Sequence, residues 1–412
     1  MSRTARLVLV DGAGTVLGAL PPLELEAPWW PEAGDVVAAA REHFEVEVTV
    51  LRLLSADRPH PPGGSVTYLA ELTGSPPAGL IPLDVIPDLS AHPLRAPYAV
   101  PGGPARTLAW ATDALAAQGW PGITPVQQKT WNLSTVWRLD GADGRRGWFK
   151  QVPPFFGHEP GLLAWLGDNV PGAAPPLLAA DPAERRMVMR DLPGRDWYDA
   201  DVAGRARISA VHHTIQLRAA GRLHELVALG VPDRRGARLT AFLRSALAGT
   251  TPSVDQVVPD LDARLAATAA CGLPDTLVHG DLWPGNTRAV DGGEPIVMDW
   301  GDATLGNPAF DIVRLAGGLD DADAAPVRRA WAARWRADVP GSEPERAAAL
   351  LTPVAALNWA ATYATFLANI EPSEHPYHAD DVQACLAMAA ELARTAPLVD
   401  TAAQPDAPTV GA

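Results

Sequence analysis

The chain of 412 residues contains only two cysteines, Cys271 and Cys385, and neither has a CxxC or Cys/His spacing. Two isolated cysteines cannot form a disulfide framework or a zinc site, so we interpret both as small buried hydrophobic residues. No apolar run reaches the roughly eighteen residues that a membrane helix needs. The first residues also lack the apolar segment and cleavage site of a secretory signal. We therefore expect a cytoplasmic protein with no membrane partner.

Basic residues are scarce, because 33 Lys and Arg stand against 48 Asp and Glu and give a formal net charge of -15. Nucleic-acid binding needs a positive surface that neutralises phosphates, and no stripe of basic residues is visible, so we expect no nucleic-acid partner. An acidic surface mildly favours a cationic substrate but more often serves solubility. With 47% hydrophobic residues, the chain can bury two or three cores of ordinary domain size.

Proline and glycine divide the chain into segments. Residues 81–106 are rich in both, which disfavours helix and strand, so we expect a linker there. After the linker, periodicity predicts a helix over residues 105–118 and another over residues 159–166. Strand-like runs are predicted at residues 134–139, 147–152 and 186–192. The order is therefore strand, strand, helix, strand.

Four parts follow from this pattern. We expect an N-terminal domain with its linker over residues 1–104 and a strand-rich unit over residues 105–192. Residues 193–400 are mostly helical by period, with a short strand pair around one polar motif. The tail over residues 401–412, rich in proline, alanine and threonine, is expected to be disordered.

The polar motif reads LVHGDLWPGN, and it begins with a short run that is typical of a buried strand ending in a tight loop at Gly280. A second apolar run, within EPIVMDWGD, ends abruptly at Asp299. We expect the two short strands to bring Asp281, Asn286 and Asp299 to one place.

Phosphoryl transfer requires this set of groups. A carboxylate orients an attacking hydroxyl and accepts its proton, whereas an amide and a second carboxylate are hard oxygen ligands for Mg²⁺. The spacing from Asp281 to Asn286 equals that of the H-R-D-x-x-x-x-N catalytic loop, with Gly280 in place of arginine, and Asp299 stands where the D-F-G aspartate would follow. A single aspartate at a strand end is more often a turn former or helix cap. The combination favours catalysis.

VHGDLWPGN followed by IVMDWGDATLGNPAFDI resembles the signature pair of the aminoglycoside phosphotransferase and choline kinase-like family, with a tryptophan after HGDL as in fructosamine kinases. The resemblance covers roughly residues 105–398. It implies an α+β, bilobal protein-kinase-like fold with a small strand-rich lobe and a large helical lobe. It also implies roles for individual residues: Asp281 as catalytic base, His279 as a brace for the catalytic loop, Asn286 and Asp299 as Mg²⁺ ligands, and Asp311 as a structural aspartate. Asp302 could support the site or be merely exposed.

The strand-rich unit should then bind ATP. In a kinase-like small lobe a strand lysine neutralises phosphate charge and is held by a glutamate on the next helix. Lys129 and Lys150 are the only lysines of this arginine-rich chain, and a lysine in the apolar run GWFKQV suggests that a compact ammonium is needed. Glu159 is the expected partner of Lys150. The alternative for Glu159 is an acid that stabilises a helix N-terminus.

The loop that would cover the phosphates has no glycine between Ile123 and Leu139, so the chain lacks a G-x-G-x-x-G loop, and no Walker A motif exists. In many members of the resembled family a serine-bearing turn has this role. Our candidate is therefore Ser134, with Asn132 shaping the turn, against the alternative of an ordinary capped turn. Backbone groups of Met189, Asp191 and Leu192 are the candidates for contacting adenine.

The acceptor site leaves a weaker trace. The resemblance implies that helices of the large lobe bind the acceptor, so residues 357–381 are the expected wall. Trp359, Tyr363 and Phe366 recur at helical spacing, which is more often a core stripe than a sugar platform. Glu371 and Glu374 could face a polar acceptor or belong to a solvated loop. His212, His213 and His224 lack metal-like spacing and are interpreted as scaffold or surface residues.

The first segment resembles a Nudix domain, with a strand pair, a helix carrying Arg-Glu and later strands. Against the Nudix signature, Arg41, Glu42 and Glu45 match, whereas Val46, Ala33 and Ala27 replace two glutamates and a glycine. A carboxylate cluster that holds Mg²⁺ on a diphosphate cannot survive those losses intact. We therefore expect a noncatalytic small α/β domain that caps or gates the kinase.

The sequence is compatible with three functional hypotheses. The first is an ATP-dependent kinase acting on a hydroxyl or amine of a small molecule such as an aminoglycoside, amino sugar or ketosamine. The second is a nucleotide-binding regulatory module whose chemistry has lapsed; the retention of Lys150, Asp281, Asn286 and Asp299 speaks against it. The third is a protein kinase, which the missing glycine-rich loop and A-P-E segment disfavour. The sequence selects neither the acceptor nor the oligomeric state.

Overall fold

The computed structural model describes residues 2–396 and 398, so the predicted tail over residues 401–412 lies outside the described residues. Its strands are β1 (Arg3–Val10), β2 (Val16–Ala19), β3 (Leu23–Leu25), β4 (Glu47–Ala56), β5 (Gly64–Thr73), β6 (Thr124–Trp131), β7 (Ser134–Asp140), β8 (Arg146–Gln151), β9 (Leu177–Asp181), β10 (Arg186–Arg190), β11 (Arg195–Asp196), β12 (Thr276–Val278), β13 (Thr287–Ala289), β14 (Ile296–Val297) and β15 (Thr304–Gly306).

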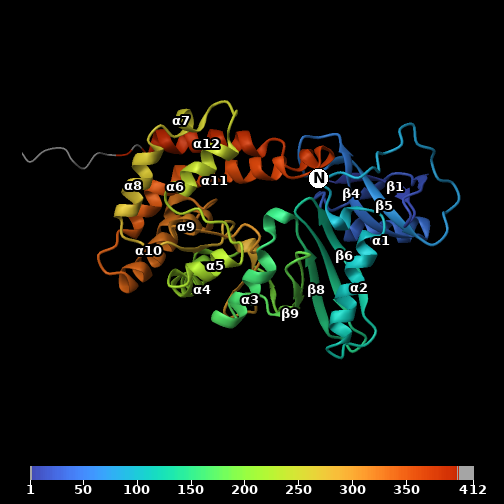
Figure 1. Cartoon of the computed structure of the whole chain (residues 1–412), viewed down its shortest axis with the longest axis horizontal. Helices are drawn as coiled ribbons and strands as arrows, with labels where there is room; N and C mark the ends of the chain where they lie inside the picture. The colour runs from blue at the N-terminus through green and yellow to red at the C-terminus, as the bar shows by residue number, and fades with distance from the viewer. Residues whose placement is uncertain (1, 397, 399–412) are drawn as a thin grey trace, which may run out of the picture.

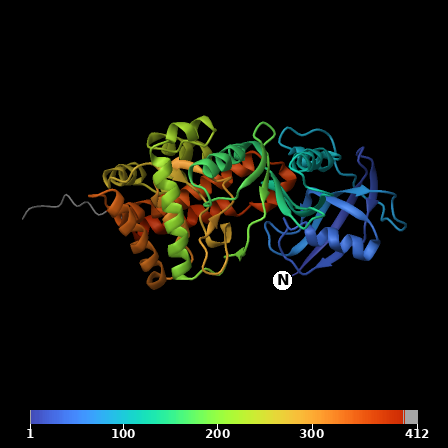
Figure 2. The same ribbon diagram turned by 90° about the horizontal axis from the view of Figure 1, so that it is seen from below.

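The α-helices are α1 (Gly34–Phe44), α2 (Gly103–Ala116), α3 (Glu159–Asn169), α4 (Val202–Ala220), α5 (Leu223–Ala228), α6 (Ala237–Ala246), α7 (Val254–Val257), α8 (Leu261–Ala270), α9 (Ala309–Leu315), α10 (Asp321–Asp338), α11 (Pro344–Ala368) and α12 (Asp381–Thr395). Short 3₁₀ helices are η1 (Pro97–Ala99), η2 (Pro154–Phe156), η3 (Pro284–Asn286) and η4 (Pro372–Tyr377). The N-terminal strands stand at one end of an elongated molecule and the C-terminal helices at the other (Figures 1 and 2).

The N-terminal region, residues 2–73, is built on a five-stranded sheet in the order β2-β1-β5-β4, with β3 also paired to β1. Strands β1 and β5 are parallel, and the other pairs are antiparallel. Helix α1 packs on this sheet, and Trp30 and Tyr68 are buried in the core beneath it. Arg3 is fully buried, where its guanidinium contacts Asp35 at 2.5 Å. The buried charge is therefore paired, as burial requires.

The strand-rich lobe is an antiparallel sheet in the order β6-β7-β8-β10-β9. The three predicted strands are confirmed as β7, β8 and β10, and the two predicted helices as α2 and α3. Helix α2 begins at Gly103, inside the predicted linker. Its Ala111 and Leu115 pack against Phe149 and Val188 of the sheet. Strands β6 and β9 were not predicted, because TPVQQKTW and LLAAD lack a clear alternation of apolar and polar residues.

The helical lobe surrounds α11, the one described helix that is long and apolar enough to cross a membrane by length and composition. Half of its most apolar window is buried within the protein. Helix α11 packs against α12, α9 and α8, which is typical of the core helix of a globular lobe. The two five-stranded sheets and this helical lobe together make the fold α+β.

The N-terminal region contacts both lobes. Backbone hydrogen bonds join residues 31–33 to β6, and Lys129 of β6 lies 3.1 Å from the carboxylate of Glu32. The side-chain amide of Gln127 both accepts from Val50 N–H and donates to Val50 C=O. On the helical side, Tyr377 of η4 is buried in the N-terminal core. Figure 1 shows this C-terminal segment against the N-terminal strands.

Candidate active site

The catalytic loop connects β12 to η3, and its first turn depends on Gly280. That residue has a φ of 85°, and a Cβ there would stand 2.3 Å from the backbone oxygen of Asp302. A side chain at this position is therefore excluded by both conformation and space. The predicted strand pair is wrong in its partners: β12 pairs with β15, and β14 pairs with β13. Strand β12 thus pairs with a strand that follows Asp299, whereas β14 pairs with the strand directly before it in the chain.

The carboxylate of Asp281, the predicted base, lies between two side chains that donate hydrogen bonds to it. Its Oδ1 accepts from Arg314 Nε at 2.8 Å, and its Oδ2 accepts from Asn286 Nδ2 at 2.9 Å. Its side chain is about one-third exposed, at 34%. The carboxylate is oriented by protein donors and remains reachable from solvent, as a proton acceptor for a bound hydroxyl must be.

Asp311 holds the backbone of the catalytic loop in place. Its carboxylate accepts hydrogen bonds from the backbone N–H groups of His279 and Gly280, at 2.9 and 3.1 Å. It also accepts from the side chains of His212, at 2.6 Å, and Gln216, at 3.1 Å. Burial opposes ionisation, but His212 and the other donors outweigh it and hold the pKa of Asp311 below its ordinary value.

His279 is fully buried and lies between the two motifs. Its Nε2 donates to the carbonyl of Met298 at 2.9 Å, and its Nδ1 accepts from the backbone N–H of Asp281 at 3.3 Å. This pair of bonds requires the neutral ring. Burial lowers the pKa of His279 and favours the same form. The side chain supports the loop and the start of the Asp299 turn.

Lys150 joins the small lobe to the large one. Its Nζ lies 2.7 Å from the Glu159 carboxylate and 2.7 Å from Asp299 Oδ1, so the predicted ion pair with Glu159 is present. Glu159 also accepts from the backbone N–H of Trp300 at 3.2 Å. Asp299 itself has a φ of 61°, a left-handed conformation that costs a non-glycine residue energy and is typical of functional turns.

The charges of Lys150, Asp299 and Glu159 depend on one another. Burial alone would lower the pKa of Lys150, but the carboxylates of Asp299 and Glu159 raise it overall, so the ammonium is charged. Burial also opposes ionisation of Asp299, yet Lys150 lowers its pKa. The pKa of the enclosed Glu159 is raised, chiefly by burial. The ionised member that can face a metal is therefore Asp299.

Two oxygen donors fit a magnesium ion at this place. Asp299 uses Oδ1 for Lys150 and keeps its side chain 59% exposed. Asn286 donates its amide hydrogens to Asp281, which leaves the amide oxygen without a partner among the described residues. A backbone bond of 2.8 Å from Met298 N–H to Asn286 C=O holds the two ligand positions side by side. Mg²⁺ is commonly bound by one or two such groups plus phosphate oxygens and water.

The predicted phosphate contacts Asn132 and Ser134 lie at the tip of the β6–β7 hairpin and are buried. Asn132 Oδ1 lies 3.2 Å from His378 Nε2, and Ser134 accepts from the indole of Trp131 at 3.2 Å. The hairpin tip thus packs on the helical lobe, and both side chains have protein partners. Lys150 pairs with Val136 in the same sheet, two residues beyond Ser134.

The predicted adenine segment follows β10. The Asp191 side chain is fixed by the indole of Trp148 at 2.6 Å, and the Leu192 carbonyl accepts from Arg288 at 2.9 Å. Met189 pairs with Trp148 in the sheet and packs against the large core. Among described residues, the Asp191 carbonyl and the Leu192 N–H have no hydrogen-bond partner. These two backbone groups are the free donor and acceptor of the segment.

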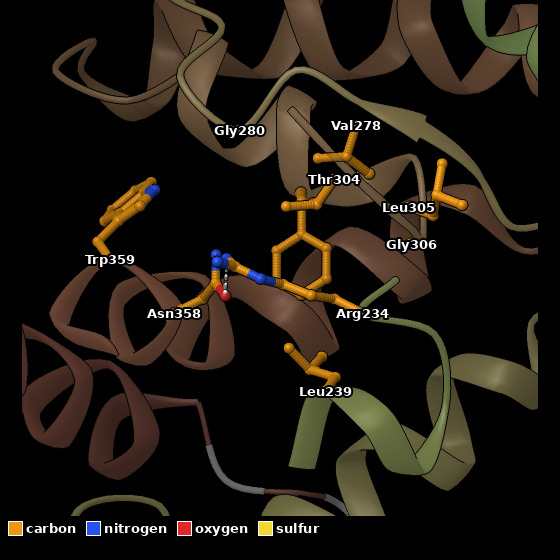
Figure 3. A pocket seen from close by; sticks show the side chains of 10 residues that line it. Arg234, Leu239, Val278, Gly280, Thr304, Leu305, Gly306, Asn358 and Trp359 are labelled. Atoms are coloured by element: carbon orange, nitrogen blue, oxygen red, sulfur yellow. Dashed lines mark hydrogen bonds between the residues drawn. The ribbon is translucent and has the colours of Figure 1, made fainter. Parts of the chain in front are cut away.

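The residues of the expected acceptor wall differ in their surroundings. Glu371 and Glu374 are 4% and 6% exposed, and Glu371 pairs with Arg95 of the linker, so neither faces a cleft. Trp359, in contrast, lines a small pocket together with Gly280 (Figure 3). Phe366 is buried in the core, as the stripe interpretation predicted.

Sequence reasoning missed two arginines near the catalytic loop. Arg314 lies one helical turn after Asp311 on α9, a spacing that places both on one face and could have suggested the contact with Asp281. Arg234 precedes α6 and lines the pocket with Trp359. No local motif surrounds Arg234 in the sequence.

Comparisons with known proteins also indicate a phosphotransferase. The profile of the phosphotransferase enzyme family matches residues 132–350. No curated protein sequence matches. Among solved structures, the macrolide 2'-phosphotransferase MphH from Brachybacterium faecium is similar, with 20% identity, 69% of this chain and 97% of that chain covered, and a TM-score of 0.49.

Two further structures are similar at the same level. A choline/ethanolamine kinase family protein from Mesorhizobium loti has 18% identity, covers 70% of this chain and 99% of its own, and gives a TM-score of 0.48. Choline kinase LicA from Streptococcus pneumoniae has 12% identity, with 69% and 99% covered and a TM-score of 0.49. The match over residues 132–350 spans more than half of the chain and contains both motifs. The chain belongs to the phosphotransferase enzyme family and is a small-molecule kinase.

Proposed function

We propose that the protein transfers the γ-phosphate of ATP to a hydroxyl group of a small molecule. The observation that carries this proposal is the ion-paired Lys150, which contacts both Glu159 and Asp299 at 2.7 Å, next to a loop that presents Asp281. A lapsed regulatory module would have no reason to keep this arrangement together with a solvent-reachable carboxylate. Aminoglycosides, amino sugars and ketosamines are acceptors to include in the test.

Each residue has a role that follows from its contacts. Asp281 would orient the acceptor hydroxyl and take its proton, while Arg314 and Asn286 fix the direction of the carboxylate. Lys150 would neutralise phosphate oxygens. Asn286 and Asp299 would hold Mg²⁺, which supplies positive charge to the transferring phosphate when bound. His279 would act as a positioning residue, because both of its ring nitrogens are engaged by the backbone, one by the Met298 carbonyl and the other by the Asp281 N–H.

The nucleotide base would lie against the segment after β10, with the Asp191 carbonyl and the Leu192 N–H contacting its edge. Met189 would contribute an apolar contact. Ser134 and Asn132 would cover the phosphates only after the hairpin tip leaves its present partners. The choice between ATP and GTP is not encoded in backbone contacts of this kind.

The N-terminal part, with boundaries at residues 1–104, is proposed as a degenerate Nudix-like domain that caps residues 105–192 and 193–400. Its contacts with β6 and η4 support a capping role. Glu42 is exposed on α1, and Arg41 pairs with Glu47 at 2.6 Å. A cytoplasmic location remains a prediction from the sequence.

The test is ADP release from Mg-ATP, alone and with a panel of aminoglycosides, amino sugars, ketosamines and choline. Asp281→Asn should lower turnover by about 100-fold or more, the range found for loss of a general base. Asp255→Asn is the matched control, since its carboxylate is 68% exposed and pairs only with Arg244. Wild-type turnover in the Asp281 variant would remove the assigned base. Tight Mg-ATP binding without any turnover would favour the regulatory module.

A further inference from the structure

Arg234 lies in a pocket that begins at the catalytic loop. The pocket is lined by ten residues, including Gly280, Thr304, Asn358 and Trp359 (Figure 3). No acidic side chain is among these ten residues. Because Gly280 immediately precedes Asp281, a molecule whose hydroxyl reaches Asp281 has this pocket beside it.

The position of Arg234 is fixed by its backbone. Its N–H donates to the carbonyl of Leu305 at 2.9 Å, so the segment before α6 lies alongside β15. Strand β15 in turn pairs with β12, which leads into the catalytic loop. The guanidinium carbon stands 3.7 Å from the ring centroid of Phe242, which supports the group from one side. The arginine is therefore held in place relative to Asp281.

The hydrogen bonds of Arg234 leave one edge of the guanidinium unused. Nη1 donates to the side chains of Asn358 at 3.1 Å and Thr362 at 3.4 Å. Nε is buried and has no partner, and Nη2 makes no hydrogen bond with a described residue. The Nε–Nη2 edge presents two parallel donors, the geometry that binds a carboxylate with both oxygens.

The charge of Arg234 has no ion-pair partner within residues 2–396 and 398. Three other enclosed arginines are paired: Arg3 with Asp35, Arg95 with Glu371, and Arg264 with Asp260. The buried Arg52 has no carboxylate at ion-pair distance among the described residues, but its guanidinium donates to the carbonyl of Asp88. Asp302 acts on Arg234 electrostatically without reaching ion-pair distance. An enclosed charge without a counterion is costly. Arg314 differs from Arg234, because its charge is matched by Asp281.

We propose, on the basis of the phosphotransferase function above, that the acceptor carries a carboxylate besides its hydroxyl and that Arg234 binds this carboxylate. The pocket holds a cavity of about 10 Å³, the space of about one water molecule, which suits a carboxylate oxygen better than a phosphate group. Trp359 lines this pocket and also carries the guanidinium of Arg314, the ion-pair partner of Asp281, over its ring. A polycationic acceptor would meet repulsion at the same place.

The test is calorimetric titration of the full-length protein, saturated with Mg-ADP, using matched pairs of hydroxy carboxylates and their neutral amides. The pairs are glycolate and glycolamide, L-homoserine and L-homoserinamide, and D-gluconate and D-gluconamide, with D-glucosamine and choline as cations. At least one carboxylate should bind about 10- to 100-fold more tightly than its amide, the effect expected of a charge-assisted hydrogen-bonded pair. Arg234→Gln should abolish this preference.

Two further variants make the outcome specific. Arg234→Lys keeps the charge but loses the two-donor edge, so it should retain part of the preference. Arg238→Gln is the matched control, since that arginine is 66% exposed and pairs with Asp233, and it should keep the full preference. The proposal is overturned when no carboxylate binds better than its amide in wild type, or when the preference survives Arg234→Gln. Failure of the phosphotransferase function would instead appear as ADP release that is insensitive to Asp281→Asn.

Discussion

Replacing Asp311 by asparagine should loosen the catalytic loop while changing the side chain by a single atom. The carboxylate accepts three hydrogen bonds at Oδ2, from His279 N–H, His212 and Gln216, and one at Oδ1, from Gly280 N–H. Asparagine has one oxygen and one amide nitrogen. With its oxygen in the Oδ2 place, its NH₂ group must face the N–H of Gly280, donor against donor.

The magnitude follows from counting these bonds. One buried N–H loses its acceptor, at a cost of about 1–3 kcal/mol. The three remaining bonds lose their charge assistance, which about halves each of them. Together the loss is roughly 3–5 kcal/mol, a large share of the 5–15 kcal/mol that stabilises a typical protein. Because the pKa of Asp311 is lowered, its contribution is present above the ordinary value of 3.8 and disappears as the pH falls through the lowered value.

Hydrogen exchange at pH 7 and thermal unfolding measure the two consequences. The amides of His279 and Gly280 should exchange faster in Asp311→Asn, and its melting temperature should fall. Asp338→Asn is the control, because that carboxylate is 46% exposed and accepts one bond, of 2.8 Å, from the neighbouring His213. The control should change stability by less than about 1 kcal/mol. Equal effects of the two substitutions would refute the assigned role of Asp311.

Three further predictions concern the N-terminal part and the residues near it. Burial and then the nearby Glu371 raise the pKa of Glu374 to about 8, so this group should make the wild type lose stability as the pH rises from 5 to 9, by up to about 4 kcal/mol at about 1.4 kcal/mol per pKa unit. In urea titrations Glu374→Gln should show a smaller loss than wild type over the same pH range, and the slope that remains is expected from Asp302, whose pKa burial also raises to about 8. Arg95 and Glu371 form a buried ion pair of 2.6 Å, so Arg95→Leu should lower the free energy of unfolding by about 3–5 kcal/mol. Replacing both residues by leucine should restore most of this stability. If the effects of the two single substitutions simply add in this double-mutant cycle, the pairing is contradicted. The third prediction is that the full-length protein does not hydrolyse the diphosphate bond of Nudix-type substrates, as measured by phosphate release. Metal-dependent hydrolysis that Glu42→Gln abolishes would show that the Nudix-like part is catalytic.

Much of the catalytic centre could be predicted from the sequence because its residues are close along the chain. Gly280, Asp281 and Asn286 belong to one loop whose spacing the chemistry fixes. The pairing of Lys150 with Glu159 was also predictable, because a kinase-like small lobe pairs a strand lysine with a glutamate of the next helix. The strands β7, β8 and β10 followed from their alternation.

The remaining features depend on contacts between distant residues. Gln127 and Gln128 make β6 look like a polar segment, but the amide of Gln127 is satisfied by Val50, 77 residues earlier. Arg234 belongs to the pocket only because its segment lies alongside β15. Glu371 was expected either to face a polar acceptor or to belong to a solvated loop, and it is instead buried in an ion pair with Arg95. Periodicity in one segment carries no information about which distant segment will cover it.

The backbone bonds between residues 31–33 and β6 affect how the protein can be divided. Strand β6 is the outer strand of its sheet, and an uncovered outer strand can recruit strands of other molecules. A shortened protein starting at Gly103 would expose that strand together with the aromatic rings of Trp131 and Tyr377, which pack at 5.8 Å from each other. We therefore expect the first quarter of the chain to protect the remainder from self-association, and any truncation for crystallisation or assay should preserve it.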